Sequence, residues 1–204
     1  MEFVSDSLLA IGGLKPVSIY EGTVIHLYTT DGELVQSFFD RTEKAKALNV
    51  TVRMGVGFDI HKDRLYAIQP VDYAISVFTL EGTRERTVRA ASLPEHLKLP
   101  ATPQPNPMED RAGAIQWTQE SDALRRLFVV NENLVLITVQ KAGLDRRYMD
   151  FIDRSTGRVV HSRPFDGWVV DADPKRGWIY VAEPQDEPVT LLRAYRVGDL
   201  LESG

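Results

Sequence analysis

The chain has 204 residues, of which 43% are hydrophobic and 26% charged, a composition typical of a soluble globular protein. Its formal net charge of −5 argues against nucleic acid as a partner, because nucleic-acid-binding proteins usually present a basic patch. Cysteine is absent, which excludes disulfides, thiolate metal ligands and a thiol nucleophile. No apolar run approaches the roughly 18 residues of a membrane span, and the N-terminus does not read as a signal peptide.

The first unit of strand-like segments covers residues 1–40. Its apolar runs are short and contain the β-branched and aromatic residues that favour half-buried strands. Thr30-Asp31-Gly32-Glu33 is a strong hairpin signal between the last two runs. The expected strands are a stub at Phe3-Val4, then Ser7–Ile11, Thr23–Tyr28 and Leu34–Phe39. Arg41–Leu48 follows and, being rich in Lys, Glu and Ala, is expected to form a short helix.

The second unit, residues 55–89, has the most regular pattern and predicts one four-stranded antiparallel meander. Its expected strands are Gly57–Ile60, Arg64–Gln69, Ile75–Thr79 and Arg84–Val88. The first two are joined by His61-Lys62-Asp63 and the last two by Glu81-Gly82, and each connection suits a tight turn.

Residues 90–122 form a Pro-rich insertion after the second unit. Five prolines interrupt it, so Leu97–Asp110 (LKLPATPQPNPMED) is expected to be an extended, exposed connection. Ala112–Glu120 fits either a helical turn or a strand. A connection of this length inside a compact domain is usually functional or mobile, and we interpret it as a loose insertion between repeats.

Two further units follow, approximately residues 124–164 and 168–198. The expected strands are Leu124–Val130, Leu134–Val139, Tyr148–Asp153 and Val159–Arg163, then Val169–Asp173, Trp178–Glu183 and Thr190–Val197. The fourth unit lacks a last strand, because Gly198–Gly204 reads as a polar tail. Four repeats of one strand–turn–strand pattern predict an all-β fold in which about four β-propeller blades form a single domain, residues 1–204.

Four stretches of sequence carry a resemblance to a known family. IHLYTTDGELVQSF, ISVFTLEGTRERTV and MDFIDRSTGRVVHSR resemble the second half of a blade of the bacterial six-bladed β-propeller proteins related to NHL repeats, and VVDADPKRGWIYVAEP resembles the first half. Six blades need about 250 to 300 residues at the usual blade size. The resemblance therefore implies a C-terminal fragment of an incomplete six-bladed ring, with a four-bladed propeller as the alternative.

An incomplete ring has consequences for partners and localisation. Two blade faces and an unpaired strand edge would be exposed, so we expect marginal stability or self-association through these faces. The compartment stays unknown: the protein is extracytoplasmic if a true start with an export signal lies upstream, and cytoplasmic otherwise.

The residues that could support catalysis or metal binding do not form a recognisable motif. His26, His61, His96 and His161 are spaced so that no three are brought together, and we predict neither a metal site nor a cofactor. The sequence has no HExxH, GxSxG, P-loop or dinucleotide fingerprint. Three aspartates end expected inner strands and are interpreted as turn caps, with a cation over a central channel as the alternative: Asp59, Asp171 and Asp173.

Propeller architecture indicates where a ligand would bind. We expect it on the face built from the loops between second and third strands and from the blade-to-blade connections. The ligand-binding candidates on that face are Lys15, Tyr20, Gln69, Asp72, Tyr73, Asp145, Arg146, Glu183 and Asp186, with Arg147 beside them. We expect the three tryptophans, Trp117, Trp168 and Trp178, to be blade-packing anchors.

Mixed charge and two tyrosines on that face suit a protein, a peptide or a polar small molecule. The sequence therefore favours a non-catalytic binding or scaffold propeller over an enzyme. The alternative is a lactonase-like hydrolase or lyase with a divalent cation at the central channel, which would require carboxylates or imidazoles from several blades to converge there.

Overall fold

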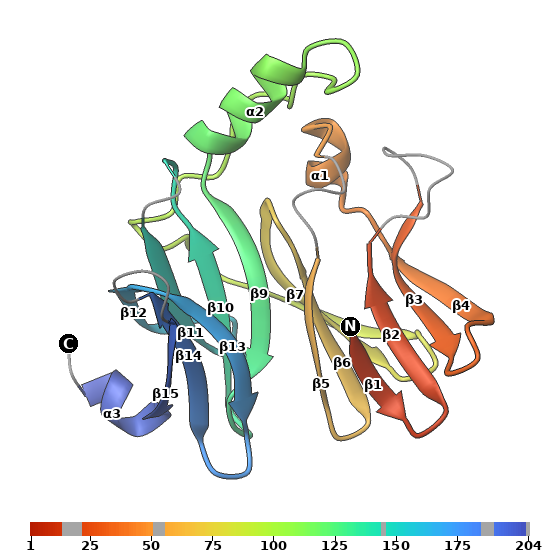
Figure 1. Ribbon diagram of the computed structural model, residues 1–204, viewed down its shortest axis with the longest axis vertical. Coiled ribbons are helices and arrows are strands. Elements are labelled where there is room, and N and C mark those ends of the chain that lie inside the picture. Colours follow the sequence, from red (N-terminus) through yellow and green to blue (C-terminus); the bar gives the residue numbers. More distant parts are fainter. Residues whose placement is uncertain (14–21, 51–55, 144–145, 185–189, 203–204) are drawn as a thin grey trace.

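The computed structural model describes residues 1–13, 22–50, 56–143, 146–184 and 190–202. Its strands form four separate antiparallel sheets, in each of which strands adjacent in sequence are also adjacent in space. The four sheets are arranged like the blades of a β-propeller, as the sequence predicted (Figure 1). They are named blade 1 (β1–β4), blade 2 (β5–β8), blade 3 (β9–β12) and blade 4 (β13–β15).

The strands agree closely with the expected runs. Blade 1 contains β1 (Glu2–Ser5), β2 (Leu8–Gly12), β3 (Thr23–Thr29) and β4 (Leu34–Asp40). Blade 2 contains β5 (Gly57–His61), β6 (Arg64–Gln69), β7 (Asp72–Thr79) and β8 (Arg84–Arg89). Blade 3 contains β9 (Ala123–Val129), β10 (Leu134–Gln140), β11 (Arg147–Asp153) and β12 (Val159–Phe165), and blade 4 contains β13 (Trp168–Asp173), β14 (Trp178–Pro184) and β15 (Thr190–Arg196).

The chain outside the strands forms three short helices within the described residues. The predicted helix after blade 1 is α1 (Glu43–Ala47), and its first turn is capped by Thr42 Oγ1, which accepts from Ala45 N. Among the described residues blade 4 has three strands, as expected, but the polar-tail interpretation was wrong. Residues there form α3 (Val197–Glu202), and Val197 and Leu200 are buried between blades 3 and 4 because they lie on its apolar side.

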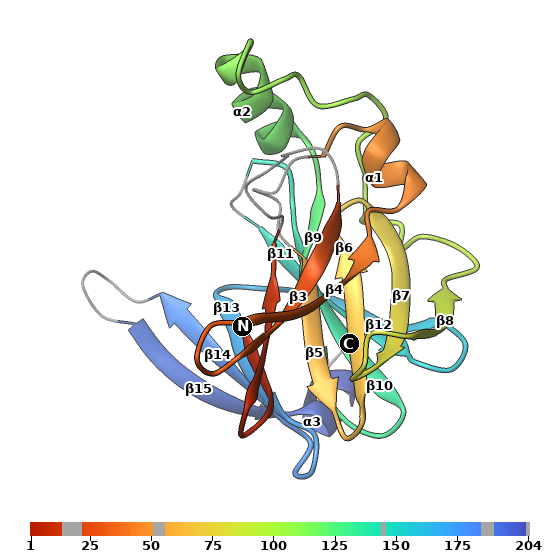
Figure 2. The same cartoon turned by 90° about the vertical axis from the view of Figure 1, so that its right-hand side faces the viewer.

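The interpretation of residues 90–122 as a loose insertion was also wrong, although within it Leu97–Asp110 has no strand, as expected, and most of its residues are exposed or half-buried. The ambiguous stretch is α2 (Arg111–Glu120), and α1 and α2 lie at the same end of the molecule (Figures 1 and 2). Leu97 is buried against blades 2 and 3, and Gln104 N donates to Leu48 O at 2.8 Å. Trp117 on α2 packs with residues of the blade 1–blade 2 connection. The prolines set an extended backbone, but its apolar side chains still dock on the propeller.

The hydrophobic core lies between the blades. Because side chains alternate across a strand, each blade presents one apolar face to the blade before it and another to the blade after it. Leu65 and Phe78 of blade 2 pack on blade 1, whereas Tyr66 and Ile68 pack on blade 3. A third cluster joins blade 3 to blade 4 around Phe151. The fold is therefore stabilised at three blade junctions.

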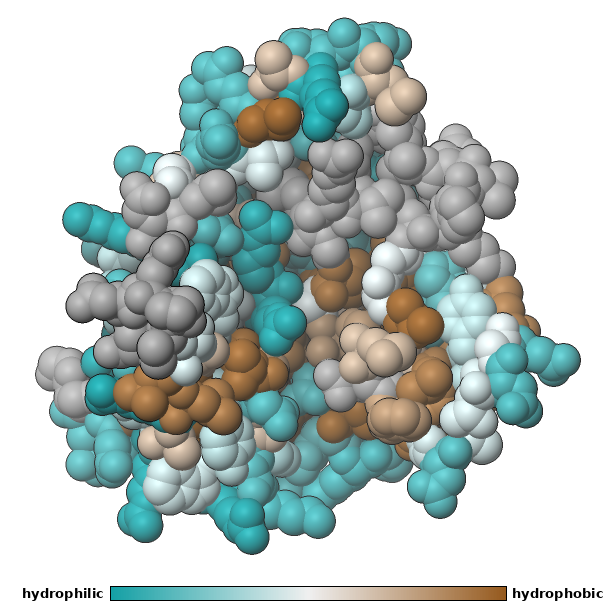
Figure 3. All heavy atoms as spheres, viewed as in Figure 1, coloured by the Kyte–Doolittle hydropathy of each residue, from teal (hydrophilic) through white to brown (hydrophobic). Residues whose placement is uncertain are grey.

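None of the described residues covers the outer faces of blades 1 and 4 in this way. Leu192 of blade 4 is 61% exposed, and Val35 of blade 1 is 54% exposed. Figure 3 shows apolar surface gathered over the β13–β15 region and, opposite it, over the β1–β5 side. Trp168 is 49% exposed and is not the packing anchor that we expected, and Trp117 anchors the insertion rather than a blade.

Within the described residues, no helix is both long and apolar enough to cross a membrane.

Candidate functional site

The predicted ligand-binding residues fall into three groups. Lys15, Tyr20, Asp145 and Asp186 lie outside the described residues. Gln69, Asp72 and Tyr73 are buried, with 2%, 7% and 6% exposure. Arg146 is exposed beside β11, and Glu183 lies between blades 3 and 4. The structure therefore does not gather these residues into one site.

Gln69 supports the connection between blades 1 and 2. Its side-chain amide accepts from Thr42 N at 2.9 Å and donates to Asp40 O at 2.9 Å. Both contacts hold the end of β4 and the start of α1 in place. The turn that follows Gln69 has only two residues, Pro70 and Val71, so Gln69 is the last paired residue of a hairpin and not part of an open loop.

Tyr73 belongs to a buried polar cluster between blade 2 and blade 3. Its hydroxyl donates to Asp150 at 2.9 Å, and Ser162 Oγ donates to the other carboxylate oxygen at 2.7 Å. Burial, with the nearby Asp150 carboxylate, raises the pKa of Tyr73. His96 stacks on Tyr148 at 4.1 Å between ring centroids, and its Nε2 lies 3.2 Å from Asp150. Asp150 is fully buried, so the cluster fixes the insertion on the blades and is not accessible to a substrate.

A groove of about 420 Å³ runs between blades 1 and 2, and we call it the first groove. Its lining has five cationic side chains and three carboxylates: Arg41, Lys44, Lys46, Arg84 and Arg89, with Asp40, Glu43 and Asp72. The sequence-predicted residue Asp72 is therefore on its wall. Arg84 and Arg89, on β8, were not among the predicted ligand-binding residues. In the sequence of an exposed strand, a charged residue that lines a groove looks the same as one that points into solvent.

The charges of the first groove are only partly compensated. Arg89 Nη1 lies 3.0 Å from Asp72 Oδ1, and Lys46 Nζ lies 2.8 Å from Glu43 Oε1. Arg41 is buried and donates to the carbonyls of Ala45 and Val50, so it has a structural role. The guanidinium carbon of Arg84 lies 5.6 Å from the ring centroid of Phe78. Excess positive charge in the groove contrasts with the net negative charge of the chain.

Glu183 lines a second groove, of about 430 Å³, between blades 3 and 4. Arg193 Nε lies 3.0 Å from its carboxylate, and Tyr195 Oη donates to the other carboxylate oxygen. This hydrogen bond raises the pKa of Tyr195. Glu183, Arg193 and Tyr195 are thus bonded to one another. Fewer of their polar atoms are therefore available to bind a ligand here than in the first groove.

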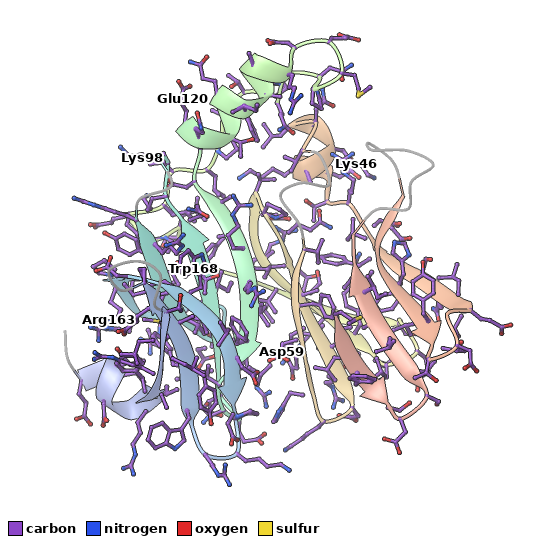
Figure 4. The ribbon with its side chains drawn as sticks, viewed as in Figure 1. Lys46, Asp59, Lys98, Glu120, Arg163 and Trp168 are labelled. Atoms are coloured by element: carbon purple, nitrogen blue, oxygen red, sulfur yellow. The ribbon has the colours of Figure 1, made fainter. Side chains whose placement is uncertain are left out.

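The three strand-end aspartates have different roles. Asp173 Oδ1 accepts from the backbone N–H groups of Lys175 and Arg176, which is the predicted turn cap. Asp59 instead joins two blades: Oδ1 accepts from Ile60 N and Oδ2 from Val129 N of blade 3, each at 2.7 Å. Figure 4 labels Asp59 beside β5 and β9. No group of three or more His, Asp or Glu side chains that could hold a metal ion occurs within the described residues.

Comparison with known proteins shows a similarity of fold. No protein-family model matches the sequence, and no curated protein matches it. The chain is similar to the crystal structure of a member of the DUF4221 family from Bacteroides vulgatus, with a TM-score of 0.57 and 12% identity. The match covers 95% of this chain but only 62% of that one, so the chain spans about three fifths of its length. At this identity the similarity shows the fold alone.

Proposed function

We propose that this chain is a non-catalytic binding scaffold whose four blades belong to a six-bladed, NHL-repeat-like ring. The blade motifs of the sequence support the repeat type. The uncovered apolar faces of blades 1 and 4 support a larger ring, because faces of this kind are covered at the other junctions. The greater length of the similar DUF4221 chain points the same way.

The observation that carries the binding role is the first groove. Its volume of about 420 Å³ falls in the range of small-molecule and peptide sites, roughly 300 to 1,000 Å³. Its floor is held by hydrogen bonds from Gln69, so the wall residues are preorganised. Because cationic side chains outnumber carboxylates in the lining, the groove favours an acidic peptide or another anionic polar ligand.

The test is fluorescence anisotropy with a fluorescein-labelled hexaglutamate peptide and, for comparison, a labelled hexalysine peptide. We expect saturable binding of the acidic peptide only, weakened about tenfold by R84Q together with R89Q. R86Q is the matched control, because Arg86 is on the same strand but its guanidinium donates to Arg154 O of blade 3. Equal binding of both peptides, or equal loss in R86Q, would rule out the groove as the site.

A further inference from the structure

A distortion in β9 brings an arginine out of the regular strand pattern. In the pairing of β9 with β10, Arg126 is opposite Thr138, whereas Leu124 is opposite Val139. Arg125 is therefore the additional residue of a β-bulge. Bulges redirect side chains and often occur next to functional sites. Here the bulge places two consecutive arginines at the entry to an inner strand of the propeller.

A third arginine reaches the same place from β11. Arg147 is paired with Gln140 at the end of the β10–β11 hairpin, and its guanidinium carbon lies 4.4 Å from the ring centroid of Trp168. Figure 4 labels Trp168 at the end of β13 that faces blade 3. A cavity of about 60 Å³ is lined by Arg125, Arg126 and Arg147 together with Thr138, Gln140 and Trp168, among others. Three guanidinium groups thus converge between blades 3 and 4.

This arginine cluster has no carboxylate partner in the part of the chain that the structure describes. Arg126 Nη1 makes one long contact, 3.4 Å to Val169 O, and Arg125 Nε is buried without a hydrogen-bond partner. Burial, and then the neighbouring charge of Arg147, lowers the pKa of Arg125. By contrast, the buried carboxylate of Asp122 is paired with Lys141. Like charges that approach each other under partial burial destabilise the folded state unless an anion neutralises them.

We propose that Arg125, Arg126 and Arg147 form a binding site for one oxyanion group, the carboxylate or phosphate of a ligand. Guanidinium groups match both oxyanions through paired, charge-assisted hydrogen bonds. The cavity of about 60 Å³ has room for such a group and not for a whole metabolite, so the remainder of the ligand lies outside it. This site is at a different junction from the first groove, and its existence does not depend on a ligand there.

The experiment is a thermal-unfolding titration with sodium phosphate or sodium acetate, each compared with sodium chloride at equal ionic strength. We expect a saturable stabilisation by one of the two oxyanions beyond that of chloride. R147Q should weaken the apparent affinity by about tenfold or more, because it removes a charge-assisted hydrogen-bonding group. R146Q is the control: it removes the same charge one residue away, outside the cavity, and should change the affinity less than twofold.

A second variant keeps the test decisive if R147Q folds poorly. R125Q removes one buried like charge, so we expect its unfolding temperature without oxyanion to equal or exceed that of the native chain, while the response to oxyanion disappears. Phosphate and acetate arms identify which oxyanion the site prefers. Stabilisation no greater than with chloride, or an equal loss of affinity in R146Q, would overturn the proposal. Neither result would change the peptide binding expected of R84Q, R89Q and R86Q. The proposal for the arginine cluster and the proposal for the first groove can therefore be refuted separately.

Discussion

The junction between blades 2 and 3 and the outer face of blade 4 share one local feature, an aspartate on the first strand of the blade that is paired with a tyrosine on the second. Asp59 is paired with Tyr66 across β5 and β6, and Asp171 is paired with Tyr180 across β13 and β14. Each aspartate accepts from the next backbone N–H, Asp59 from Ile60 at 2.7 Å and Asp171 from Ala172 at 2.8 Å. The two aspartates are thus oriented alike by their own strands.

What differs is the second carboxylate oxygen. In Asp59 it accepts from Val129 N of blade 3, whereas in Asp171 it has no partner among the described residues. Tyr66 is 4% exposed, while Leu192 on the outer face of blade 4 is 61% exposed. A blade therefore carries its half of a junction before any neighbour covers it. The covered junction should therefore respond strongly to mutation, and the open face weakly.

The largest effect is expected from Gly57→Ala, where β5 lies close to the backbone of β9. A Cβ on Gly57 would lie 2.9 Å from Arg126 Cα and Leu127 N, backbone atoms that cannot move aside without disturbing β9. We expect the free energy of unfolding, measured with urea, to fall by about 2–3 kcal/mol. Gly198→Ala in α3 meets nothing within 4 Å and should be neutral or slightly stabilising. Equal effects of both changes would contradict the close approach.

Next in size is Asp59→Ala, compared directly with Asp171→Ala. Asp59→Ala leaves Val129 N without an acceptor inside the junction, so we expect a loss of about 1–3 kcal/mol in the free energy of unfolding. Asp171→Ala removes one contact at an uncovered face and should cost less than about 0.5 kcal/mol. A similar loss in both variants would show that the aspartates act locally on their own strands and not between blades.

Mutations on the outer face of blade 4 should affect self-association of the chain more than its free energy of unfolding. We expect the chain to self-associate in a concentration-dependent way, as the exposed apolar faces predict, and Leu192→Ser to weaken that association by about tenfold. The free energy of unfolding should change little, because Leu192 is already 61% exposed. Sedimentation velocity over a range of concentrations measures the association. A compact monomer at every concentration would contradict the expectation.

Most of the fold could be predicted because it depends on local patterns. The boundaries Arg64–Gln69 follow directly from apolar alternation and flanking turns, and positive φ angles at Gly32 and Gly82 agree with their hairpin positions. The packing of the insertion could not be predicted in this way. Leu97 and Trp117 are buried through contacts with residues distant in sequence, and a Pro-rich composition indicates only backbone conformation.

The candidate sites were less predictable for a related reason. Gln69 and Tyr73 were assigned to an open loop, but the actual turn is two residues long and both side chains are buried at blade contacts. Arg125 and Arg126 lie within an expected strand, and no residue pattern in the sequence predicts the β-bulge that changes the direction of their side chains. Arg147 was noted beside the ligand-binding candidates because it ends a predicted hairpin loop. Its convergence with the other two arginines depends on strand register and blade placement.

The smallest effect is expected at Asp153, which ends β11 at the β11–β12 turn of blade 3, away from the inner strands of the junction with blade 2. Hydrogen bonds from Ser155 Oγ and the backbone N–H of Thr156 lower the pKa of Asp153 to about 2. Since this folded-state value is below the unfolded value of about 3.9, the stabilisation is complete above about pH 4 and is lost as the pH falls toward 2. The carboxylate is solvated, so Asp153→Asn should lower stability slightly at pH 5, and the difference from the native chain should be much smaller at pH 2, where the folded-state carboxylate is about half protonated. Urea unfolding of both chains at pH 5 and pH 2 measures this. A difference as large at pH 2 as at pH 5 would mean that the side chain acts through shape and not charge.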